Sequence, residues 1–141
     1  MIHRTPLPTD VRERLKTLGQ VLEKCSGMVF TYLFGSLAAG RFDPLSDVDV
    51  AVFLDEVLDP VEQKLEVIGA ASGHLRTDEV DVVVLNTAPT ALIGRILQSR
   101  QVICDRDPFR RHRFESRALR EFFDFRVFEH RLLVRRYAGG C

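Results

Sequence analysis

Near the start of the chain, apolar residues recur at the spacing of one helical face, at Val11, Leu15, Leu18, Val21 and Leu22. Asp10 precedes this run, and Glu13 lies three residues after Asp10. This spacing is that of a capping box at the beginning of a helix. The pattern predicts one helix from about Asp10 to Lys24.

The next two apolar runs are too short for helices and favour strands. Met28–Phe34 is rich in β-branched and aromatic residues and is followed by Gly35, so it predicts a buried strand that ends at the glycine. The run Asp47–Leu54 begins with acids alternating with valines. Because side chains alternate across a strand, Asp47 and Asp49 are expected on one face and the valines on the other.

The remainder of the chain continues the alternation of helices and strands. Asp59 offers an N-cap and Pro60 a first helical position for a helix that ends near His74. Its expected buried stripe is Val61, Leu65, Ile68 and Leu75. The later expected elements are a strand at Val80–Leu85, a helix from Pro89 to about Arg100, a strand at Gln101–Cys104 and a helix from Asp107-Pro108 to near Tyr137. This order predicts an α/β fold with a small mixed sheet flanked by helices and a long C-terminal helix.

The composition is that of a globular protein, with 45% hydrophobic and 28% charged residues and a net charge of zero. No apolar run approaches the roughly 18 residues of a membrane span, and the first ten residues lack the apolar core of a signal peptide, so a cytoplasmic protein is expected. The three cysteines (Cys25, Cys104, Cys141) and four histidines (His3, His74, His112, His130) show no metal-ligand spacing. The balanced charge predicts neither bulk attraction to nucleic acid nor to an anionic membrane.

The balanced charge hides a difference between two parts of the chain. Residues 107–141 contain nine arginines and five acidic residues, a net charge of +4, so the other 106 residues carry −4. Six of the ten phenylalanines also lie in this tail. The shift predicts a main domain at 1–106 and a C-terminal helical arm at 107–141.

The segment FGSLAAGRFDPLSDVDV carries the candidate chemistry. Gly35-Ser36 is followed after ten residues by Asp47-Val48-Asp49, and Asp81 adds an acid in the third strand. Two carboxylates on one strand face can converge on a pair of divalent cations, as nucleotidyl transfer requires. Gly35 would let the backbone approach a phosphate, and the backbone N–H groups after it would donate hydrogen bonds to the phosphate oxygens. The Ser36 hydroxyl is a further donor. The apolar run around Asp81 predicts that it is buried, and because a buried carboxylate without a partner is costly, this favours a role in the site. The structural alternative for Asp81 is a position on an edge strand or in a salt bridge.

The segments LFGSLAAGRFDPLSDVDVAVFL and EVDVVVLNTAP resemble the minimal nucleotidyltransferases of the DNA polymerase β superfamily. The tail DPFRRHRFESRALREFFDFR resembles that of MntA-type antitoxins, which are paired with HEPN-domain ribonuclease toxins. The resemblance implies a polymerase β-like nucleotidyltransferase fold. It also implies an enzyme that uses Mg²⁺ and ATP to transfer AMP to a tyrosine hydroxyl of the HEPN toxin, which neutralises that toxin.

The same resemblance assigns roles by motif position. Gly35 and Ser36 match the nucleotide-phosphate turn, and Asp47, Asp49 and Asp81 match the catalytic carboxylates that hold two Mg²⁺ ions. Many relatives carry arginines where this chain has Leu37 and Ala39, and often a second acid where it has Val84.

Two questions stay open at the level of the sequence. The stripe Phe114, Ala118, Phe122, Phe125, Phe128 and Leu132 fits either packing on the main domain or a partner interface, and the arginines beside it fit either a solvated face or an acidic or RNA-bearing partner. The alternative functions are an antitoxin that acts by binding alone and a nucleotidyltransferase that modifies RNA or a small molecule.

Overall fold

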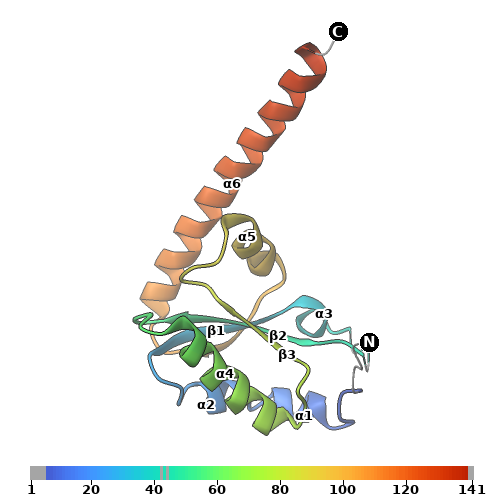
Figure 1. Cartoon of the computed structure of the whole chain (residues 1–141), viewed down its shortest axis with the longest axis vertical. Helices are drawn as coiled ribbons and strands as arrows, with labels where there is room; N and C mark the ends of the chain where they lie inside the picture. The colour runs from blue at the N-terminus through green and yellow to red at the C-terminus, as the bar shows by residue number, and fades with distance from the viewer. Residues whose placement is uncertain (1–5, 42, 44, 140–141) are drawn as a thin grey trace.

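The computed structural model describes residues 6–41, 43 and 45–139. Helices and strands alternate along this part of the chain, which confirms the expected α/β class with a long C-terminal helix (Figure 1). The elements are α1 (Val11–Leu15), α2 (Leu18–Leu22), β1 (Met28–Phe34), α3 (Gly35–Ala38), β2 (Val48–Leu54), α4 (Pro60–Leu75), β3 (Val80–Val84), α5 (Thr90–Ser99), β4 (Gln101–Asp105) and α6 (Pro108–Gly139).

The four strands form one mixed sheet in the order β3-β2-β1-β4. Strand β1 is antiparallel to both β2 and β4, whereas β2 and β3 are parallel and are joined through α4. The register places Asp49 opposite Phe34 of β1 and opposite Asp81 of β3. The end of β1 and the beginnings of β2 and β3 therefore meet at one end of the sheet.

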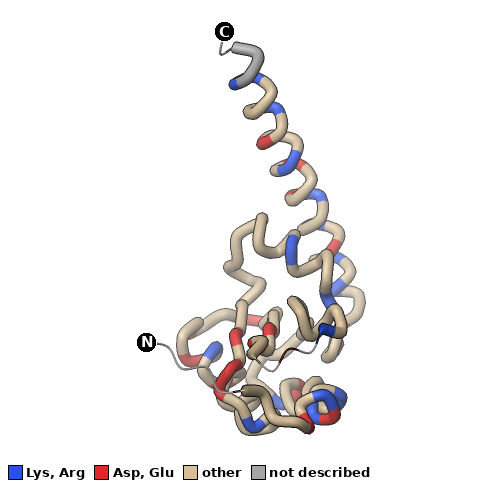
Figure 2. The backbone as a smooth tube through the Cα atoms, turned by 90° about the vertical axis from the view of Figure 1, so that its right-hand side faces the viewer, with Lys and Arg blue, Asp and Glu red and all other residues tan. Residues whose placement is uncertain are grey.

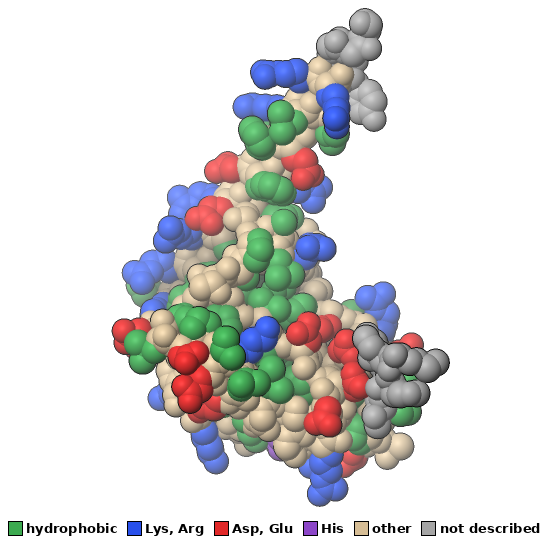
Figure 3. Space-filling view, viewed as in Figure 1, with side chains coloured by type: hydrophobic (Ala, Val, Ile, Leu, Met, Phe, Trp, Pro, Cys, Tyr) green, Lys and Arg blue, Asp and Glu red, His purple; other side chains and the backbone are tan. Residues whose placement is uncertain are grey.

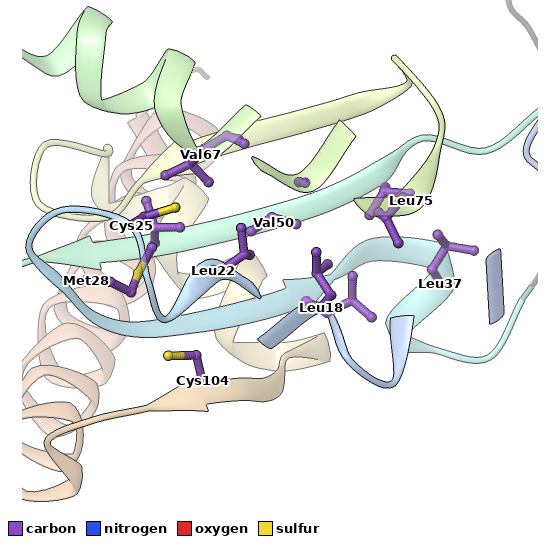
Figure 4. Packing of buried hydrophobic residues seen from close by; sticks show 14 of the residues in the cluster. Leu18, Leu22, Cys25, Met28, Leu37, Val50, Val67, Leu75 and Cys104 are labelled. Carbon is purple, nitrogen blue, oxygen red and sulfur yellow. The ribbon is translucent and has the colours of Figure 1, made fainter. Parts of the chain in front are cut away.

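Helices cover both faces of the sheet. Figure 1 shows α1, α2 and α4 on one side and α5 with the first part of α6 on the other. The first side holds the larger apolar cluster, drawn in Figure 4, with Leu18, Leu22, Val50, Val67 and Leu75 among its members. Cys25 and Cys104 are buried free thiols in this cluster, whereas Cys141 and His3 lie outside the described residues.

The single helix expected over residues 10–24 is wrong, because two short helices replace it. His74 Nε2 lies 2.9 Å from the Arg14 carbonyl oxygen and 2.8 Å from the Thr17 hydroxyl oxygen, so a group from α4 occupies the carbonyl that a continuous helix would use. Asp10 forms no side-chain cap and instead accepts a 2.7 Å hydrogen bond from Arg14. A tertiary contact thus overrides the local helical pattern.

Helix α4 begins as expected but turns a different face to the sheet. The Asp59 carboxylate caps the helix by accepting a 3.1 Å hydrogen bond from the Glu62 backbone N–H. Val61 and Leu65, expected to be buried, are 69% and 61% exposed. The buried residues of the helix are Val67, Ala71 and Leu75, with Ile68 partly buried beside them. The prediction is therefore confirmed for Leu75 and in part for Ile68, and it is wrong for the first two turns of the helix.

A buried polar network fastens the start of α6 to the sheet. Glu115 is only 5% exposed, and its carboxylate accepts a 2.8 Å hydrogen bond from the buried Tyr32 hydroxyl. Arg100 Nε donates to the same carboxylate at 2.6 Å and Arg111 Nη1 at 2.9 Å. Arg111 also donates to Asp105 at 2.8 Å. Because each charged group of the network has an oppositely charged neighbour, these contacts offset the cost of burying the Glu115 carboxylate.

Helix α6 packs on the domain over its first half only. The Phe114 ring lies 5.6 Å from Phe30 and 5.1 Å from Phe53, and Phe122 is 7% exposed against Gly94 of α5. Beyond this point the helix extends away from the domain (Figure 1). From Phe123 onward, the exposed large apolar residues are Phe123, Phe125, Val127, Phe128, Leu132, Leu133 and Val134. Among the described residues, no helix is both long and apolar enough to cross a membrane.

We expect Gly94→Ala to lower the free energy of unfolding by about 1 to 3 kcal/mol, because a Cβ at this position would overlap the Phe122 ring. Gly73 of α4 is the matched control, since a Cβ there meets no atom within 4 Å and an alanine should add about 0.5 to 1 kcal/mol through helix propensity. Urea denaturation of both variants measures the difference. Equal stability of the two variants would show that Phe122 does not lock α5 to α6.

Candidate active site

The turn after β1 requires a glycine for two reasons. Gly35 has a φ of +76°, in the left-handed region that side chains rarely adopt. A Cβ on Gly35 would also collide with the Asp49 carboxylate on the neighbouring strand. The backbone of the turn therefore lies in direct contact with the first half of β2. Sequence reasoning placed both residues in the site but did not predict that they touch.

The structure brings two of the three expected carboxylates together across adjacent strands. Asp49 and Asp81 are register partners in the parallel pair β2–β3, and both side chains lie on the sheet face that carries α5 and α6. Asp47 immediately precedes β2, and its charge acts on Asp49. Acidic side chains gather at this end of the sheet in Figure 3. Asp81 is exposed rather than buried as expected, because β3 is an edge strand.

Among the three carboxylates, Asp49 is the one whose pKa is raised. It is half-buried, and burial raises the pKa of its carboxyl from the usual 3.8 to about 6, with the charges of Asp81 and Asp47 adding to the effect. Like charges at close range disfavour the ionised form. A cation or a positively charged ligand at this position would relieve the repulsion.

The rest of the turn offers backbone groups and one hydroxyl. Helix α3 has four residues, and the first N–H groups of any helix have no partner within it. Ser36 is half-buried beside them. Leu37 is 3% exposed and belongs to the apolar core, so this position presents no side chain to a ligand, and Ala39 is exposed. Val84 faces the core on the opposite side of the sheet from Asp49.

The carboxylate oxygens of this site are ligands that a hard cation such as Mg²⁺ prefers, although they do not enclose it. Within the part of the chain that the structure describes, no three His, Cys, Asp or Glu side chains stand close enough together to hold a metal ion. Mg²⁺ is commonly bound by one or two carboxylates, with water and substrate phosphates completing its shell. The pair of Asp49 and Asp81, with Asp47 adjacent, fits that open arrangement.

The chain matches the model of a known protein family over most of its length. The model described as "Polymerase beta, Nucleotidyltransferase" matches residues 16–109, which include the whole sheet and every candidate site residue. The match ends two residues into α6. A comparison with curated proteins found no match.

Solved structures with the same fold include chains of toxin–antitoxin complexes. A mutant MntA-HpeT complex has a TM-score of 0.72 and 19% identity, with 84% of this chain and 94% of that chain covered. A toxin-antitoxin structure with AMP-PNP has a TM-score of 0.70 and 20% identity, with 85% and 94% covered. A third, described as a tri-AMPylated Shewanella oneidensis HEPN toxin with MNT antitoxin, has a TM-score of 0.67 and 18% identity, with 87% and 95% covered. These likenesses establish the fold.

We expect Asp49→Asn to raise the free energy of unfolding at pH 7 without metal by about 1 to 3 kcal/mol. The folded-state pKa near 6 lies above the usual 3.8, so the unfolded chain loses this proton first, and the wild type loses stability as the pH rises from about 4 to 6. The variant should lack that loss.

Urea denaturation between pH 4 and 7 measures the effect, with Asp124→Asn on the exposed face of α6 as the control. Parallel pH profiles for wild type and Asp49→Asn would contradict the assignment of strain to Asp49.

Proposed function

Because the chain belongs to the polymerase beta nucleotidyltransferase family, we propose that it is the antitoxin of a toxin–antitoxin pair and acts as a protein adenylyltransferase. In this proposal it transfers AMP from ATP to a tyrosine hydroxyl of a HEPN-domain ribonuclease toxin in the cytoplasm. The similar solved structures support it, since they include a toxin–antitoxin complex with AMP-PNP and an AMPylated HEPN toxin with its antitoxin. The observation that carries the proposal is the Gly35 turn packed on Asp49, with Asp81 in register.

The proposed reaction is a displacement at the α-phosphorus of ATP. The tyrosine oxygen forms the new P–O bond, the bond between the α- and β-phosphates breaks, pyrophosphate leaves, and the phenolic proton passes to solvent. The turn at Gly35 lets the phosphates approach the backbone, where the N–H groups of α3 and the Ser36 hydroxyl donate hydrogen bonds.

Asp47, Asp49 and Asp81 would hold the Mg²⁺ ions, two in number by analogy with two-metal sites. When bound, Mg²⁺ neutralises phosphate charge and stabilises the leaving oxygen. The contribution of the chain is to place carboxylates of adjacent strands side by side and to keep Asp49 half-buried. The repulsion that raises the pKa of Asp49 without metal then becomes attraction for the cation.

We further propose that residues 1–106 form the catalytic domain and that the exposed part of the arm 107–141 docks the toxin. Phe125, Phe128 and Leu132 continue the stripe that begins in the core, but they are 40%, 61% and 50% exposed. A row of exposed apolar side chains on one helix is typical of a protein interface. The domain core thus covers the first half of the stripe and the partner would cover the second.

We expect Asp47→Asn and Asp49→Asn each to abolish AMP transfer while leaving the protein folded, because both remove charge that the cations need. The assay incubates the purified protein with labelled ATP, Mg²⁺ and a HEPN-domain protein encoded beside its gene, and measures label on the toxin. Glu56→Gln is the control: it removes an exposed carboxylate that follows β2, away from Asp49 and outside the arm, and should transfer at the wild-type rate.

The same assay separates the alternatives. Toxin neutralised without label would establish an antitoxin that acts by binding alone, and label on RNA or a small molecule instead of the toxin would establish a different acceptor. Near wild-type turnover in Asp49→Asn would refute the assigned site.

We expect Phe128→Asp to leave the melting temperature unchanged but to weaken toxin binding at least tenfold, because the charge would be buried only in the complex. Phe122→Asp is the matched comparison: it should lower the melting temperature by many degrees, because Phe122 is packed on Gly94. Thermal unfolding and titration calorimetry measure both effects. Wild-type affinity in a folded Phe128→Asp protein would exclude this residue from the interface.

A further inference from the structure

A groove lies between α5 and α6, at the other end of the sheet from the candidate active site. It has a volume of about 770 Å³. Phe53 and Asn86, near the ends of β2 and β3, line its floor, whereas Asp49 and Asp81 lie near the beginnings of the same strands. Asp49 and Phe53 are four positions apart along β2, which corresponds to roughly 13 Å. The groove is therefore not an extension of the carboxylate site.

One wall of this groove is an arginine face of α6. Arg110, Arg113, Arg117 and Arg120 all line it. Their spacing of three, four and three residues places them on one side of the helix over about 15 Å. Figure 3 shows basic side chains gathered along one side of the lower part of α6, and Figure 2 shows the basic positions following the helix. The family match ends at Phe109, so all four arginines lie beyond it.

Local carboxylates neutralise only part of this charge. Arg110 is paired with Asp55, and Arg117 lies 3.2 Å from Glu121. Arg113 and Arg120 form no ion pair with a carboxylate among the described residues. A surplus of two guanidinium groups thus remains beside an open groove, which favours an anionic occupant.

Exposed aromatic surface accompanies the charge. Phe109 lines the groove, is 76% exposed, and has the Arg113 guanidinium 5.8 Å from its ring centroid. Arg110 lies 5.2 Å from the Phe53 ring in the same groove. Flat apolar rings interleaved with arginines suit nucleobases, which stack on aromatic faces while their phosphates meet cations. An acidic polypeptide would use the charge but has no need of an exposed ring.

We propose that this groove binds single-stranded nucleic acid through phosphate contacts to Arg113 and Arg120 and base stacking on Phe109. The proposal is independent of the adenylyltransferase function, because it involves neither the carboxylates nor the turn at Gly35. The zero net charge of the chain does not oppose it, since residues 107–141 alone carry +4.

The test measures binding of a fluorescent oligouridine of about 12 nucleotides to the purified full chain by anisotropy, in EDTA, at about 50 to 200 mM salt. EDTA prevents metal-bridged binding at the carboxylates. We expect a Kd of about 1 to 100 μM at low salt, weakened at least tenfold in the double variant Arg113→Glu/Arg120→Glu. Two lost phosphate contacts should also reduce the slope of log affinity against log salt by about 1.4.

Two matched controls are available on the same helix. Arg131→Glu/Arg135→Glu makes the same change of charge on the exposed part of α6 and should alter affinity by less than twofold. Phe109→Ala should weaken binding severalfold, whereas Phe128→Ala should not. Melting temperatures of all variants confirm that each remains folded.

Three results would overturn the proposal. The first is no detectable binding by the wild type at low salt. The second is equal weakening by the two arginine double variants, which would indicate unspecific attraction to the arm. The third is displacement of the oligonucleotide by polyglutamate at equal charge concentration together with no effect of Phe109→Ala, which would assign the groove to an acidic polypeptide.

Discussion

The contact between the Gly35 backbone and the Asp49 carboxylate is the constraint on which the candidate site depends. It fixes the direction of the chain after β1, because only a glycine combines a φ of +76° with a neighbour that leaves no room for a Cβ. It also holds Asp49 half-buried beside Asp81, which stores electrostatic repulsion at the place where a cation and phosphates would bind. Turn geometry and carboxylate chemistry are thus parts of one arrangement.

The long helix α6 has two different environments along its length. Its first half is fixed by the buried Glu115 network and by Phe122 packed against Gly94. Its second half extends from the domain with apolar residues exposed on its surface. A rigid anchor of this kind holds the exposed half in a defined direction, which is an advantage for docking because little conformational entropy remains to be lost.

The elements that the sequence predicted correctly are those determined by local interactions. Strand β1 ends at Gly35 as expected, and Asp59 caps α4, because turn and cap preferences act within a few residues. The alternation of Asp49 with its neighbouring valines likewise placed it on the sheet face opposite Val48 and Val50.

The sequence predictions are wrong where contacts with a distant segment determine the local structure. The first helix is interrupted between α1 and α2, where His74 of α4 contacts the Arg14 carbonyl and the Thr17 hydroxyl. Helix α4 is rotated because the sheet selects Val67 and Ala71, so Val61 is exposed. No local pattern contains these contacts. The pairing of Asp49 with Asp81 depends in the same way on strand register.

The most direct test of the central claim compares two glycines of the same turn region. Gly35 and Gly40 have φ values of +76° and +79°, but a Cβ at Gly40 meets no atom within 4 Å. Titration calorimetry with AMP-PNP and Mg²⁺ should therefore show that Gly35→Ala abolishes nucleotide binding while Gly40→Ala, which carries the same backbone strain, retains it. Equal affinity of both variants for the nucleotide would contradict the account, because the contact with Asp49 would then have no part in binding.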